Sequence, residues 1–145
     1  MEPLDLDKQR PRGPRETILG FYFLPRTIDK LRAELPGGNM GAYLNHDTGF
    51  SAWAVRRLGL DVDEFRNAVR DAKDEDEVTA WLAARINPDD AAAFNEKFET
   101  FVIERFKPED LRLVRERHPI LAQRDDLSKI LDVLQAEDDR VFGKS

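Results

Sequence analysis

The sequence predicts an all-α protein, in which a single-domain bundle of six or seven helices, residues 16–145, follows an extended arm, residues 1–15. From Phe50 onward, apolar residues recur three and four positions apart, which places them on one face of a helix. Two segments begin with an Asp followed three residues later by a Glu, at Asp61 and at Asp74, the pattern of a capping box. The 145 residues are 41% apolar and 36% charged, which is typical of one soluble globular domain.

The arm contains three of the eight prolines and a cluster of basic residues. Proline lacks an N–H donor and disfavours helix at the residue before it, so we expect no regular structure there. Such an arm either lies on the domain or is mobile. The apolar run that follows, residues 18–24, is too short for periodicity to distinguish a strand from a helix. The basic residues of the arm are Lys8, Arg10, Arg12 and Arg15.

The first predicted helix begins at Pro25, because proline suits the first helical position, and it ends before Pro36. Ile28, Leu31 and Leu35 have helical spacing along it. The next segment, residues 36–49, contains four glycines and two asparagines, and we expect a loop.

Four more helices are predicted from residue 50 to residue 105. The first covers residues 50–58, and the next two begin at the Asp caps. The fourth, residues 88–105, is the longest, and we expect it to be central because it is apolar on nearly two sides. The apolar positions are Val62, Phe65, Val69 and Ala72; Val78, Trp81, Leu82 and Ile86; and Ala91, Phe94, Phe98, Phe101, Val102 and Ile103.

Two helices complete the predicted bundle. One begins at Pro108 and ends before Pro119. The last is capped by Asp125 or Asp126 and continues through Leu127, Ile130, Leu131 and Leu134.

Composition excludes several classes of protein. There are no cysteines, which removes disulfides, thiolate metal sites and cysteine nucleophiles and fits a reducing compartment. The run at residues 18–24 is far short of the ~20 residues of a membrane span and lacks the context of a signal peptide, so we expect a cytoplasmic protein without membrane contact. A net charge of −6 disfavours nucleic acid as a partner.

Residues 55–69 have the spacing of a helix-turn-helix. In such a motif the start of the second helix would enter the major groove, yet here it consists of Asp61, Asp63 and Glu64, which repel phosphate. Two packed helices with an acidic cap are therefore the preferred interpretation, and a DNA-binding regulator is a lesser alternative.

The sequence predicts no metal site, no cofactor and no catalytic residue. His46 and Asp47 form a pair found among metal ligands, but His118 is the only other histidine, and zinc or iron sites need three or more placed protein ligands. A hydrogen-bonded loop pair is the better interpretation of these two residues.

Four segments together resemble an uncharacterised bacterial family, the domain of unknown function DUF5069. They are residues 11–15 (PRGPR), 24–30 (LPRTIDK), 41–43 (GAY) and 138–144 (DDRVFGK). The second is the most specific, and the match touches both ends of the chain. The resemblance implies a small bacterial protein with no assigned activity, and it supplies no catalytic residue.

Our first hypothesis is a non-enzymatic binding or protein-interaction domain, although the sequence leaves an enzyme open. The alternative is a protein or enzyme that binds a small anionic ligand between the first helix and the loop. On that helix, Arg26, Asp29 and Lys30 share the face opposite Ile28 and Leu31, and we expect this face to be solvated unless it binds a ligand. Arg26 would then contact the anion in a bidentate way, and His46 is the loop group that titrates near neutrality. The sequence also leaves a homo-oligomer open. The candidate ligand-binding residues are Arg26, Asp29, Lys30, Tyr43, Asn45, His46 and Asp47.

Overall fold

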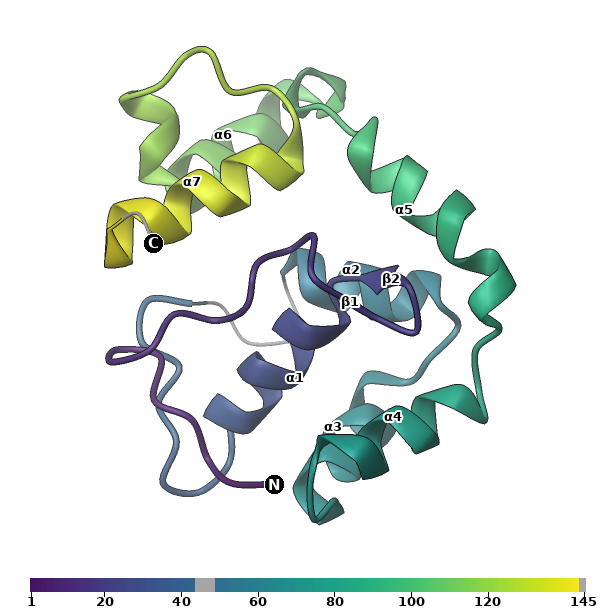
Figure 1. Ribbon diagram of the computed structural model, residues 1–145. Coiled ribbons are helices and arrows are strands. Elements are labelled where there is room, and N and C mark those ends of the chain that lie inside the picture. Colours follow the sequence, from purple (N-terminus) through teal and green to yellow (C-terminus); the bar gives the residue numbers. More distant parts are fainter. Residues whose placement is uncertain (44–48, 144–145) are drawn as a thin grey trace. The chain divides into compact units, whose positions relative to one another are not determined.

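The computed structural model describes residues 1–43 and 49–143. Over these residues it has seven α-helices, three short 3-10 helices and one two-stranded hairpin, which confirms the all-α prediction (Figure 1). The chain divides into two compact units, Met1–Ala91 and Ala92–Ser145. The division into an arm and one helical domain stays a prediction. Every helix in the described residues is too short or too polar to cross a membrane.

The first unit contains the hairpin and four α-helices. Its elements are β1 (Thr17–Ile18), β2 (Phe21–Tyr22), α1 (Leu24–Ala33), α2 (Phe50–Arg57), α3 (Val62–Asp71), α4 (Glu75–Ala83) and the 3-10 helix η1 (Pro88–Asp90).

The apolar run before α1 forms the hairpin rather than a helix. Ile18 pairs with Phe21 across an antiparallel register. The two residues between the strands, Leu19 and Gly20, have φ angles of 54° and 85°, as a tight two-residue turn requires. Such angles suit glycine and cost a leucine conformational energy, so the tertiary context holds this turn in place.

Helix α1 is the central helix of this unit. All eight residues from Leu24 to Leu31 are buried, including the polar ones. The N-terminal arm covers part of α1: Leu4 and Leu6 are buried with Ala33, and the Leu4 N–H donates to the Arg32 carbonyl at 3.2 Å. The arm therefore lies on this unit.

Helices α3 and α4 begin where the capping pattern predicts. The Asp61 carboxylate accepts a hydrogen bond from the Glu64 N–H at 3.0 Å, and Asp74 accepts one from the Glu77 N–H at 3.1 Å. Glu77 in turn accepts from the Lys73 N–H at 2.8 Å, one residue before the cap. Local side-chain bonds thus fix both helix starts.

The second unit begins within α5 and contains two further α-helices. Its elements are α5 (Ala91–Glu99), the 3-10 helix η2 (Ile103–Arg105), α6 (Pro108–Arg117), the 3-10 helix η3 (Pro119–Ala122) and α7 (Ile130–Phe142). Helix α6 has the predicted bounds, with His118 as its C-terminal cap residue.

Two helix predictions in this region are wrong. Residues 88–105 do not form one long helix: η1 leads directly into α5, which ends at Glu99, and η2 begins only at Ile103. The final helix begins at Ile130 rather than at Asp125 or Asp126. Both differences have one cause: Val102 lies opposite Lys129 in an isolated β-bridge. The bridge pairs backbone groups that a continuous helix would use internally. Its hydrogen bonds are Ile103 N–H to Ser128 O, 2.8 Å, and Ile130 N–H to Phe101 O, 3.0 Å.

Candidate functional site

The polar face of α1 is buried, so the expectation of a solvated face is wrong. Arg26, Asp29 and Lys30 are 2%, 5% and 7% exposed. The cause is again long-range packing. Arg12 of the arm lies against Asp29, and the ring of Tyr43 lies near Arg26 and Lys30.

Arg12 links the arm to both α1 and α4. Its guanidinium makes a bidentate contact with Asp29, through Nε to Oδ2 at 3.1 Å and Nη2 to Oδ1 at 3.0 Å. The Arg12 N–H also donates to Asp29 Oδ2 at 2.8 Å. The same guanidinium donates to Glu75 at the start of α4. Burial lowers the pKa of Arg12, but the hydrogen bonds that its guanidinium donates to Glu75 and Asp29 outweigh this effect and raise the pKa above its ordinary value. The residue is therefore a permanent cation held by two carboxylates.

Arg26, Lys30 and Tyr43 are brought together by the fold. The Arg26 Cζ lies 5.6 Å from the centre of the Tyr43 ring, and the Lys30 Nζ lies 5.5 Å from it. These distances are within the range of a cation–π contact. Asp29 instead binds Arg12, and Asn45, His46 and Asp47 lie outside the described residues. The structure thus brings together three of the seven predicted site residues, with Arg26 and Lys30 beside the Tyr43 ring.

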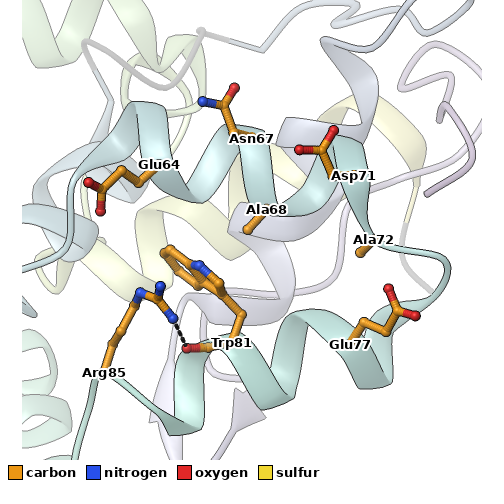
Figure 2. A pocket seen from close by; sticks show the side chains of 8 residues that line it. All are labelled: Glu64, Asn67, Ala68, Asp71, Ala72, Glu77, Trp81 and Arg85. Carbon is orange, nitrogen blue, oxygen red and sulfur yellow. Dashed lines mark hydrogen bonds between the residues drawn. The ribbon is translucent and has the colours of Figure 1, made fainter.

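A second candidate site is an open hollow between α3 and α4, which sequence reasoning missed. We call it the α3–α4 hollow; its volume is about 490 Å³. Figure 2 shows the Trp81 ring between the two helices, beside the small side chain of Ala68, with Ala72 farther to the right along the hollow. The lining residues are Glu64, Asn67, Ala68, Asp71, Ala72, Glu77, Trp81 and Arg85.

Trp81 forms the aromatic wall of this hollow. Its ring packs against Phe65 of α3, with ring centres 5.5 Å apart. The guanidinium of Arg85 lies over the Trp81 ring at 4.1 Å from its centre, and Arg85 Nη1 donates to the Trp81 carbonyl at 2.8 Å (Figure 2). Trp81 is only partly buried, so it does not belong wholly to the core that its helical spacing suggested.

The segment that forms the hollow is strongly acidic. Residues 61–85, which include all the lining residues, contain eight Asp or Glu and four Lys or Arg, a balance of −4 within a chain of net charge −6. Glu64, Asp71 and Glu77 line the hollow and are exposed. A hydrogen bond from Arg70 is the main cause that lowers the pKa of Asp71, so this carboxylate is ionised at neutral pH. The hollow therefore presents negative charge around an aromatic wall.

One signal for the hollow was present in the sequence. Trp81 and Arg85 are four residues apart, a spacing at which helical side chains meet. What the sequence did not show is that α4 packs beside α3 with alanines between the acidic positions. Among the described residues, no three His, Asp or Glu side chains converge as ligands of a metal ion.

In a comparison with protein-family models, residues 8–140 match a family described as Domain of unknown function (DUF5069). Comparison with curated proteins gives no significant match.

Proposed function

The chain belongs to the DUF5069 family, whose description assigns no activity, and we propose from its geometry that it is a non-enzymatic binding domain for a positively charged segment of a protein partner. The binding site is the α3–α4 hollow. The observation that carries this proposal is the combination, in one open hollow, of a partly exposed tryptophan with carboxylates from both helices.

The shape of the hollow suits a long basic side chain. Lysine and arginine have apolar stems that pack on apolar surface while the charged head remains at the rim. Here Ala68 and Ala72 offer short apolar surface, and Trp81 offers a flat ring. Three carboxylates, those of Glu64, Asp71 and Glu77, lie around this surface. Figure 2 shows Glu64 on the side of Trp81 and the other two at the right of the hollow, so a charged head at either end meets a carboxylate.

Charge favours the same class of partner. A field of one sign accelerates the encounter with a partner of opposite sign and selects against like-charged partners. With four excess negative charges over residues 61–85, this surface attracts cations and repels phosphate. The exposed Asp61, Asp63 and Glu64 at the start of α3 argue against the helix-turn-helix alternative for the same reason. We also propose that the domain is located in the bacterial cytoplasm, in accordance with the resemblance and with a sequence that contains no cysteine.

Titration calorimetry with a short, unstructured basic peptide tests the proposal. The variant Glu64→Gln/Asp71→Asn removes two carboxylates that line the hollow. Exposed ion pairs contribute about 0.3–1 kcal/mol each, so we expect affinity to fall about threefold to thirtyfold. The matched control, Glu109→Gln/Asp110→Asn, makes the same chemical change at the exposed start of α6. Absence of binding to the wild type, or equal losses in both variants, would overturn the proposal.

A second candidate function follows from the α1 face. Two cations meet one tyrosine ring there, Arg26 and Lys30 with Tyr43, and paired cations with an aromatic group can orient a small anion. Its test compares the melting temperature of the wild type with those of Arg26→Ala and His46→Ala across a panel of anionic metabolites. If no anion stabilises the wild type, this candidate is rejected.

A further inference from the structure

We propose that the α3–α4 hollow prefers an arginine of the partner over a lysine, and that Arg85 holds the position of that arginine until the partner binds. This inference rests on the proposed function. It adds the identity of the recognised side chain and an internal competitor for the same ring.

The first argument is that the hollow already accommodates a guanidinium. The Arg85 Cζ lies 4.1 Å from the centre of the Trp81 ring, a stacking distance. A planar guanidinium stacks on an aromatic face and retains its in-plane N–H groups for acceptors, whereas an ammonium is a compact, strongly hydrated charge. The Trp81 wall therefore fits a guanidinium.

The second argument is that Arg85 can leave. It lies beyond the last residue of α4, Ala83, and its side chain is exposed. Its hydrogen bond goes to the Trp81 carbonyl on the same exposed surface. An exposed cation–π contact is worth about a twofold to fivefold change in an equilibrium constant. An incoming arginine that also reaches the carboxylates of the rim gains more than this.

The third argument is that the carboxylates of Asp71 and Glu77 can accept hydrogen bonds from a partner's arginine. Asp71 pairs with Arg70 at 2.9 Å, and both side chains are more than half exposed. Such a surface pair contributes little stability and exchanges readily with a partner's cation. Glu77 accepts one backbone N–H, from Lys73, which leaves further acceptor capacity on its carboxylate.

The experiment compares two peptides of equal length and charge, one with arginines and one with lysines at the same positions. In Arg85→Ala, the Trp81 ring is uncovered and one positive charge is lost. Lys73→Ala is the matched control: Lys73 is exposed between α3 and α4, its loss removes the same charge, and its backbone bond to Glu77 persists. We expect Arg85→Ala to bind the arginine peptide about twofold to fivefold more tightly than Lys73→Ala does. The lysine peptide should gain equally in both variants.

Trp81→Leu gives an independent readout, because it should abolish the preference for arginine while the carboxylates still attract both peptides. The indole N–H signal of Trp81 should shift in Arg85→Ala and shift again when the arginine peptide is added. If neither peptide binds the wild type or any variant, the proposed function itself fails. If the peptides bind but Arg85→Ala gains no more than Lys73→Ala, or gains equally for both peptides, the inference about Arg85 and arginine is wrong and the binding surface stands.

Discussion

Replacing Arg12 by alanine should destabilise the first unit markedly. Its bidentate partner Asp29 has a side chain only 7% exposed, and breaking a fully buried ion pair costs about 3–5 kcal/mol. Two features lower the expected cost of removing Arg12. The Arg12 side chain is 32% exposed, and Asp29 would still accept the backbone N–H of residue 12, now at 2.8 Å. The ion pair between Arg12 and Glu75, whose side chain is 38% exposed, contributes less than about 1 kcal/mol. We therefore expect a loss of about 2–3 kcal/mol in the free energy of unfolding.

Urea unfolding followed by far-ultraviolet circular dichroism measures this loss. Arg70→Ala is the control, because the Arg70 and Asp71 side chains are 56% and 67% exposed and their pair should be worth about 1 kcal/mol or less. In an Asp29→Asn background, Arg12→Ala should cost less, since no buried charge is left behind. The reasoning is refuted if Arg12→Ala costs no more than Arg70→Ala, or if Asp29→Asn leaves its cost unchanged.

Three shorter predictions concern backbone and charge. Gly38→Ala should cost about 2–3 kcal/mol of unfolding free energy, since its Cβ would lie 2.5 Å from a backbone oxygen. Gly59→Ala should cost about 1–2 kcal/mol, because Gly59 has a φ of +76° but no neighbour within 4 Å of the added Cβ. Equal losses for the two variants in urea denaturation would contradict the steric argument. Asp61→Ala should cost about 1 kcal/mol by the same measurement while Asp61→Ser retains most of the cap, and a silent alanine variant would show that the cap is not needed. The hydrogen bond from Arg124 lowers the pKa of Asp126, so the pair stabilises the fold above the ordinary carboxyl pKa and loses its contribution as pH falls through the lowered value. In Arg124→Gln, the NMR titration of Asp126 should move upward; an unmoved titration would assign the shift to another cause.

The elements that the sequence predicted correctly are those fixed by neighbours along the chain. The caps at Asp61 and Asp74 bond to backbone groups three residues away, and Pro108 begins α6 because its ring suits a first helical turn. Signals of this range can be read without knowledge of the tertiary structure, and the starts of these helices agree with the prediction, although α4 ends at Ala83, before the predicted Ile86.

The errors arise where distant segments pair. Nothing near Val102 in the sequence indicates that its backbone will lie opposite Lys129. This bridge interrupts the helix predicted over residues 88–105, and the last helix begins only after it, at Ile130. The burial of the α1 face has the same origin, since Arg12 reaches Asp29 across 17 positions and Glu75 across 63. Helical spacing alone correctly grouped Arg26 with Lys30, but only packing shows that Tyr43 lies over both.

The N-terminal arm contacts both helices that form the α3–α4 hollow, although no arm residue lines the hollow. Arg12 binds Glu75, the first residue of α4, and the backbone nitrogen of Met1 donates to the Ala72 carbonyl at the end of α3 at 2.5 Å. The two helices that form the walls of the hollow are thus each joined to the arm, at the short connection between them. The hollow lies between these two helices, so its shape depends on how they are held relative to each other. The arm therefore helps to hold the connection between α3 and α4, beside the proposed binding surface.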